Sequence, residues 1–137
     1  MGLSILIVED DKTTNEALRL MVAKKFPSAS IRSAANGSQG VELSRQQAAD
    51  LVITDINMPG MDGIVMAEAI KGVKGDTRFI VLTGYSDEIH LNSFSSVGLS
   101  AYILKPIDFK KLFAAIDKCA AEIADSSIAQ TEPGKGC

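Results

Sequence analysis

The sequence predicts an α/β protein in which five parallel strands are each followed by a helix. Two observations lead to this fold class. Short runs rich in Ile, Val and Leu alternate along the chain with longer stretches that have a helical period. Most of the apolar runs lack polar–apolar alternation, which is typical of strands covered on both faces of a parallel sheet. A strand–helix order repeated five times favours parallel neighbours joined by right-handed crossovers.

The strand predictions rest on five short runs. Four are strongly apolar and lie at residues 3–8 (LSILIV), 51–54 (LVIT), 79–83 (FIVLT) and 101–105 (AYILK). The fifth, at residues 29–34 (ASIRSA), is weaker and more polar. A polar run of this kind suits a strand that is covered less completely, so residues 29–34 are predicted to form an edge strand.

Five helices are predicted after these strands, at residues 13–26, 37–48, 64–73, 87–97 and 109–124. In the first, Leu18, Val22 and Phe26 fall on one face, and Pro27 ends the helical pattern. Gly40 weakens the prediction of the second helix. Cys119 falls on the apolar face of the last helix and is predicted to be a core residue.

Length and composition predict a single domain. The chain has 137 residues, of which 46% are apolar, and this suits one compact domain with its own core. The domain is predicted to cover residues 3–124. Residues 125–137 are polar, contain Pro and Gly and have no helical period, so they are expected to form a tail or the start of a linker.

Charge and cysteine content narrow the functional classes. The formal net charge is −3 and the sequence pI is about 5.1, so the chain offers no basic surface for nucleic acid. The two cysteines, Cys119 and Cys137, do not resemble a disulfide framework, which favours a reducing cytoplasm. No apolar stretch is long enough to cross a bilayer. We therefore expect a soluble cytoplasmic protein that binds neither nucleic acid nor membrane directly.

Polar residues stand at the carboxyl ends of four predicted strands. They are Glu9, Asp10 and Asp11 after the first strand, Asp55 after the third, Thr83 at the end of the fourth and Lys105 at the end of the fifth. Ligands of open α/β sheets bind beyond this edge. Each residue alone has an ordinary explanation, such as Asp10 or Asp11 capping the first helix. Their recurrence at one edge indicates a site.

The residue types at this edge suit phosphoryl chemistry. Carboxylates gathered together repel one another, and Mg²⁺, which prefers oxygen ligands, relieves this repulsion. Asp10 and Asp55 are predicted to bind the ion directly and Glu9 through water. Lys105 and Thr83 offer a positive charge and a hydroxyl group, which suit phosphoryl oxygens. An aspartate also attacks phosphoryl groups to form an aspartyl phosphate.

Four segments resemble the motifs of a receiver domain of a two-component response regulator. They are ILIVEDD (5–11), LVITDINMPGMDG (51–63), FIVLTG (79–84) and AYILKP (101–106), and their order and spacing agree along residues 3 to about 124. The resemblance implies a flavodoxin-like, doubly wound (βα)5 fold with a five-stranded parallel sheet in the order 2-1-3-4-5. It also implies a signalling domain of a phosphorelay and not a classical enzyme.

The resemblance further implies a role for each acidic residue. Asp55 would be the phosphoacceptor, modified by a phosphohistidine of a sensor histidine kinase or of a histidine phosphotransfer protein. Glu9, Asp10 and Asp55 would bind Mg²⁺ together with the backbone carbonyl of Asn57. Self-phosphorylation from a phosphodonor and autodephosphorylation would be the only reactions. The Lys105–Pro106 peptide would be cis.

The same resemblance implies a switch. Thr83 would bond one phosphoryl oxygen and Lys105 would neutralise another. Tyr102 matches the switch aromatic, which turns inward as Thr83 moves. The output face would be formed by the fourth helix (87–97), the fifth strand and the fifth helix. Phe94, Ile103 and the exposed side of residues 109–124 are predicted to contact a downstream target or effector domain, whose identity the sequence leaves open.

Three alternatives compete with this interpretation. A phosphohydrolase of the haloacid dehalogenase kind requires Asp-x-Asp-x-Thr after the first strand, whereas EDDKT (9–13) places Glu9 at the nucleophile position. A flavodoxin requires a phosphate-binding loop rich in Ser, Thr and Gly after the first strand, and this sequence has no such loop there. A receiver-like module that only docks partners and is never phosphorylated is disfavoured by the complete set of site residues, but the sequence leaves it open.

Overall fold

The computed structural model describes residues 2–56, 63–84 and 99–131, with side chains up to residue 124 in the last range. The elements, in chain order, are β1 (Ser4–Val8), α1 (Lys12–Lys25), β2 (Ser30–Ala34), α2 (Gly37–Gln46), β3 (Leu51–Asp55), α3 (Gly63–Val73), β4 (Arg78–Thr83), β5 (Leu99–Leu104) and α5 (Phe109–Thr131). They confirm the predicted strands and four of the predicted helices. The helix expected at 87–97, which includes Phe94, lies outside the described residues.

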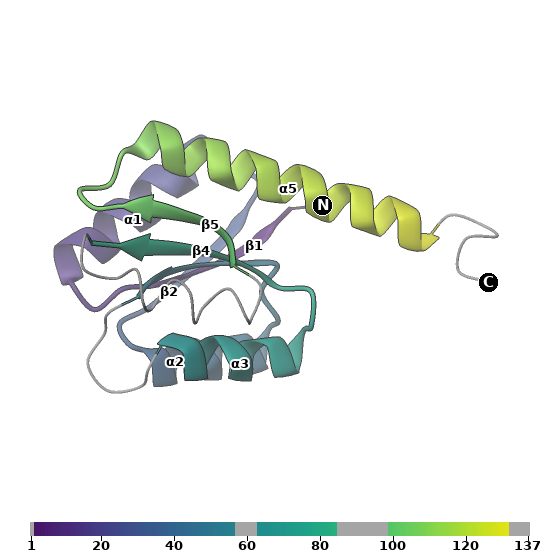
Figure 1. Ribbon diagram of the computed structural model, residues 1–137, viewed down its shortest axis with the longest axis horizontal. Helices are drawn as coiled ribbons and strands as arrows, with labels where there is room; N and C mark the ends of the chain where they lie inside the picture. Colours follow the sequence, from purple (N-terminus) through teal and green to yellow (C-terminus); the bar gives the residue numbers. More distant parts are fainter. Residues whose placement is uncertain (1, 57–62, 85–98, 132–137) are drawn as a thin grey trace.

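The five strands form one parallel sheet in the order β2-β1-β3-β4-β5. This order confirms the predicted fold class and the edge position of residues 29–34. Figure 1 shows α1 and α5 covering one face of the sheet and α2 and α3 covering the other. The three-layer arrangement explains why most strands have continuous apolar runs, since both of their faces are buried.

The core is divided by the sheet into two clusters. On β1, Leu6 and Val8 pack with residues of α2 and α3, whereas Ile5 and Ile7 pack with residues of α1 and α5. Cys119 belongs to the second cluster and is a free, buried cysteine, as predicted. Within the described ranges, none of the helices combines the length and apolar character needed to cross a bilayer.

Two polar side chains stabilise the ends of helices. Asp11 is the N-cap of α1, and its Oδ2 accepts a hydrogen bond of 2.9 Å from the backbone N–H of Thr14. Arg32, on the edge strand β2, donates to the carbonyl oxygens of Leu43 and Gln47 at 2.6 and 2.7 Å. These carbonyls lie at the C-terminal end of α2, where the backbone N–H of Gln47 also donates to the carbonyl of Leu43 at 3.1 Å. Arg32 therefore adds a second donor to the last backbone bond of this helix and supplies one to the carbonyl of Gln47 beyond it.

The predicted end of the last helix was wrong. The pattern placed this end at Ala124, but α5 continues to Thr131, and Figure 1 shows it extending past the sheet. Residues 125–131 have no apolar period but contain no Pro or Gly, the residues that interrupt helices most strongly. Extending an existing helix costs far less than starting one, so polar residues can continue it to the next breaker.

Candidate functional site

The site lies at the carboxyl edge of the sheet, where the strand register brings the polar residues together. Val8 of β1 pairs with Thr54 of β3, so the residues that follow them, Glu9 and Asp55, are neighbours. Asp55 is the last residue of β3, a strand that is buried along its whole length. Because both strands are fixed by core packing on two faces, the carboxylates at their ends have defined positions.

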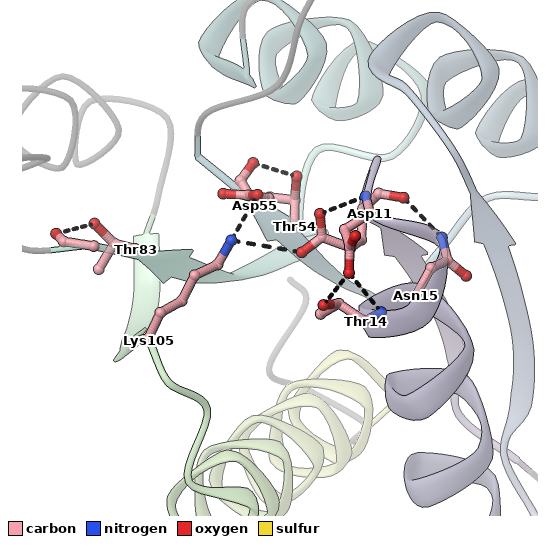
Figure 2. A network of polar contacts seen from close by, with 9 residues as sticks. Asp11, Thr14, Asn15, Thr54, Asp55, Thr83 and Lys105 are labelled. Carbon is pink, nitrogen blue, oxygen red and sulfur yellow. Dashed lines mark hydrogen bonds and ion pairs between the residues drawn. The ribbon is translucent and has the colours of Figure 1, made fainter.

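Three carboxylates form a compact cluster at this edge. One carboxylate oxygen from each of Glu9, Asp10 and Asp55 lies within 4.8 Å of the other two. Glu9 and Asp55 are only 1% and 5% exposed, whereas Asp10 is exposed. Lys105 reaches the cluster from the residue after β5, with Nζ 2.7 Å from Asp55 Oδ2 and 3.6 Å from Glu9 Oε1 (Figure 2). One cation therefore faces two buried acids.

Burial changes the protonation of this cluster. It raises the pKa of Glu9 from 4.5 to about 7, with further contributions from the charge of Asp55 and a hydrogen bond to Asp10. Burial by itself lowers the pKa of Lys105, but the hydrogen bond and charge of Asp55 outweigh it and raise that pKa above its ordinary value. The ion pair is therefore stable, while Glu9 is deprotonated fully only at a higher pH or beside an added cation.

The donor set fits a divalent cation such as Mg²⁺. Glu9 Oε1 is buried and has no hydrogen-bond donor among the described residues. Lys105 Nζ lies 3.6 Å from this oxygen, too far for a hydrogen bond, so its burial is costly unless a second cation approaches it. Carboxylates from two strands, one of them exposed to water, are the oxygen ligands that Mg²⁺ prefers. Asn57, the fourth predicted ligand, lies outside the described residues.

Asp11 is separated from the acidic cluster by its role as a helix cap. Its Oδ2 accepts hydrogen bonds from the backbone N–H and the hydroxyl group of Thr14, and these bonds lower the pKa of Asp11. The backbone N–H of Asp11 donates to Glu9 Oε2 at 3.1 Å. The capping alternative considered for Asp11 is therefore correct, and the start of α1 also orients the carboxylate of Glu9.

Two further polar contacts support the site, and no sequence pattern indicates either of them. Asn15 Nδ2 donates to the backbone carbonyls of Glu9 and Ala34, at 2.9 Å each. Thr54 Oγ1 donates to the backbone carbonyl of Asp55, also at 2.9 Å. Both side chains support the backbone of an acidic residue. A polar residue in a helix or at a strand end has no local pattern that reveals such a partner.

The predicted switch residues lie on β4 and β5. Thr83 is buried, its hydroxyl donates to the carbonyl of Gly84 at 3.2 Å, and its own carbonyl accepts from the backbone N–H of Lys105 at 2.7 Å. Tyr102 is 54% exposed. The Lys105–Pro106 peptide is cis, as predicted.

The proposed contact role of Ile103 is wrong. Ile103 is only 6% exposed and belongs to the cluster between the sheet and helices α1 and α5. Side chains alternate along a strand, so Tyr102 and Leu104 point to the opposite face, where they are 54% and 48% exposed. Phe94, the other predicted contact residue, lies outside the described residues.

Comparison with known proteins gives one consistent result. The family model for the response regulator receiver domain matches residues 5–117. The probable chemotaxis protein CheY of Rhizobium etli is 32% identical over 84% of this chain and 90% of its own length. The probable C4-dicarboxylate response regulator DctR of Priestia megaterium is 30% identical over 84% of this chain and 50% of its own length.

A solved structure agrees with these relatives. The N-terminal domain of an uncharacterized protein from Wolinella succinogenes is 30% identical and superimposes with a TM-score of 0.83, covering 91% of this chain and 99% of that domain. The chain spans only 34% to 50% of the length of several curated relatives, among them DctR. The match of the family model and the shared fold cover nearly all of the described sheet. The chain therefore belongs to the family of response regulator receiver domains, the signalling domains of two-component systems.

Proposed function

We propose that Asp55 accepts a phosphoryl group from a phosphohistidine of a sensor histidine kinase or a histidine phosphotransfer protein. A carboxylate oxygen of Asp55 forms the new O–P bond while the N–P bond of the donor breaks, and its electron pair returns to the imidazole nitrogen. The observation that carries this proposal is the position of Asp55, buried at a strand end between two acids and a lysine. Water later hydrolyses the acyl phosphate.

Each neighbour of Asp55 has a distinct task in this proposal. Lys105, already 2.7 Å from the carboxylate, neutralises a phosphoryl oxygen, and the Thr83 hydroxyl bonds another after leaving the carbonyl of Gly84. Glu9, Asp10, Asp55 and the carbonyl of Asn57 would hold Mg²⁺. The ion would neutralise the charge that develops on the phosphoryl oxygens. The rest of the catalysis is positioning by the two buried strand ends.

The phosphoryl group becomes a signal by shifting a population between two packings. Thr83 and Lys105 are joined through the backbone, so drawing both inward biases the ends of β4 and β5 together. Residues 3–124 form the receiver domain in this proposal, and residues 125–137 lead out of it. The partner that responds is a cytoplasmic target protein or an effector domain joined to this one.

The proposal is tested by phosphorylating the protein with acetyl phosphate and Mg²⁺. We expect one acid-stable, base-labile phosphate on the wild-type chain and none on Asp55→Asn. Asp76→Asn is the matched control, because Asp76 is exposed and pairs with Lys74 away from the site. A wild-type chain without an adduct would favour the docking-only alternative, and turnover of a small phosphoester would favour a hydrolase.

A further inference from the structure

Asn15, labelled in the first turn of α1 in Figure 2, connects this turn to the ends of two strands. Its side-chain nitrogen Nδ2 donates to the carbonyl oxygens of Glu9, just after β1, and Ala34, the last residue of β2. Carbonyl oxygens can only accept, so the nitrogen and not the oxygen of the amide must face them. Both hydrogens of one NH₂ group thus hold the backbone at the edge of the acidic cluster.

These bonds hold the main chain of Glu9 on both sides. The backbone N–H of Glu9 donates to the carbonyl of Ala34 at 3.1 Å, and the backbone carbonyl of Glu9 accepts from Asn15 at 2.9 Å. That carbonyl belongs to the planar peptide group between Glu9 and Asp10. Fixing its direction therefore fixes the directions in which both acidic side chains leave the backbone.

The acidic cluster needs such support because its members repel one another. A carboxylate oxygen of Glu9 lies within 4.8 Å of oxygens of two other carboxylates. Among the described residues, the N–H of Asp11 and the more distant charge of Lys105 stabilise its negative charge. Without a bound cation, repulsion favours turning the Glu9–Asp10 peptide so that the acids separate. The two bonds from Asn15 oppose that rotation.

We propose that Asn15 is a positioning residue for the cation site. This proposal rests on the proposed function, in which Glu9, Asp10 and Asp55 bind Mg²⁺. Asn15→Ala removes both bonds without replacing any of the three acidic residues. Loss of a partner that orients metal ligands costs about 10- to 100-fold in metal affinity, so we expect Mg²⁺ to bind about tenfold more weakly.

Gln39→Ala is the matched control. Gln39 and Asn15 line the same groove of about 500 Å³, and Gln39 Oε1 accepts from the backbone N–H of Ala35 at 2.7 Å. Each side chain therefore supports the backbone at the end of β2. Within the described chain, however, none of the hydrogen bonds of Gln39 reaches Glu9. A general loosening of this edge would affect both variants, whereas positioning of the acids would affect only Asn15→Ala.

The test is a Mg²⁺ titration of the wild-type chain and both variants by calorimetry, at a temperature well below their unfolding midpoints. Weaker binding by Asn15→Ala alone supports the proposal. Unchanged binding by Asn15→Ala, or equal weakening by Gln39→Ala, overturns it. A wild-type chain that binds no Mg²⁺ overturns the proposed metal site itself. The titration of the wild-type chain reveals this outcome before any variant is compared.

A second measurement needs no variant. In the NMR spectrum of the wild-type chain, the two side-chain NH₂ signals of Asn15 should exchange slowly with solvent and shift when Mg²⁺ is added. Asn15 carries no metal ligand atom in this proposal, so the shift would report the linked Glu9 carbonyl. Rapidly exchanging signals that Mg²⁺ leaves unchanged would overturn the proposal even if Asn15→Ala did not fold.

Discussion

Lys105 Nζ lies 2.7 Å from Asp55 Oδ2 and 3.6 Å from Glu9 Oε1, so that one ammonium group faces carboxylates at the ends of two different strands. The lysine partly screens the repulsion between these acids before any other cation is bound. It also stands where negative charge would arrive with a phosphoryl group. The stability and the chemistry of the site therefore depend on the same few groups.

Replacing Lys105 by Met should slow phosphorylation of Asp55 by about 100-fold, because a preorganised group that stabilises developing charge contributes this much. The measurement is the initial rate of adduct formation from acetyl phosphate at saturating Mg²⁺. Lys111→Met is the control, since Lys111 is exposed on α5. Equal rates for Lys105→Met and the wild-type chain would remove Lys105 from the mechanism.

The free energy of unfolding of the metal-free chain should fall as the pH rises from about 4.5 to about 7. Burial and the neighbouring acids raise the pKa of Glu9 to about 7 in the folded chain, from the 4.5 of an unperturbed glutamate. The folded state therefore binds this proton more tightly than the unfolded state. Binding of this proton therefore stabilises the folded chain fully below pH 4.5. As the pH rises through 7 the proton is lost, and the free energy of unfolding falls by up to about 3 kcal/mol.

Urea denaturation across this pH range measures the effect. Glu9→Gln has no titrating group at this position, so its free energy of unfolding should change less with pH than that of the wild-type chain. Added Mg²⁺ should stabilise the wild-type chain most above pH 7, where Glu9 is ionised in the absence of metal. A metal-free wild-type chain whose stability rises across the window would contradict the raised pKa.

Phosphorylation of Asp55 should bury Tyr102, which is 54% exposed on β5. The sequence has two tyrosines, so a Tyr85→Phe background leaves Tyr102 as the only one. Quenching of its fluorescence by acrylamide should then decrease on phosphorylation. In a protein that also carries Thr83→Ala, the adduct should form without this decrease, since the hydroxyl group that couples the two sites is missing. Unchanged quenching in the fully phosphorylated chain would refute the switch.

Two glycines should respond in opposite ways to replacement by alanine. A Cβ atom at Gly72 of α3 meets no atom within 4 Å, so Gly72→Ala should stabilise the protein by about 0.5–1 kcal/mol. A Cβ atom at Gly40 of α2 would lie 3.0 Å from Val8 Cγ2 and 3.5 Å from Met66 Sδ. The crowding offsets the gain in helix propensity there, so Gly40→Ala should be about 1–2 kcal/mol less stable than Gly72→Ala.

Denaturant titrations of both glycine variants measure this difference. Equal stabilisation by the two substitutions would mean that α2 can move away from β1 without cost. The structure thus explains why a glycine stands at position 40, where it weakens the prediction of the second helix. Gly40 lowers the intrinsic helix propensity of α2 but lets this helix pack closely on the sheet.

The fold could be predicted from the sequence because its signals are local. Continuous apolar runs arise in strands buried on both faces, and the predicted edge strand was recognised by its polar residues. The end of α5 could not be predicted, since residues 125–131 contain neither an apolar period nor a helix breaker. The role of Ile103 was also misjudged, because the sequence does not say which face of the last strand each helix covers.

The order of the elements follows from the amino-acid pattern alone. So does the edge of the sheet at which five polar residues gather: Glu9, Asp10, Asp55, Thr83 and Lys105. Residues that directly follow parallel strands must meet at that edge, whatever the packing in between. The packing of the elements in three dimensions sets which groups touch there. It directed Asp11 to cap α1 and kept it out of the acidic cluster, and it brought Asn15 to carbonyls six and nineteen positions away. Such contacts depend on how separate elements pack against one another, and a local pattern of residues does not specify that packing.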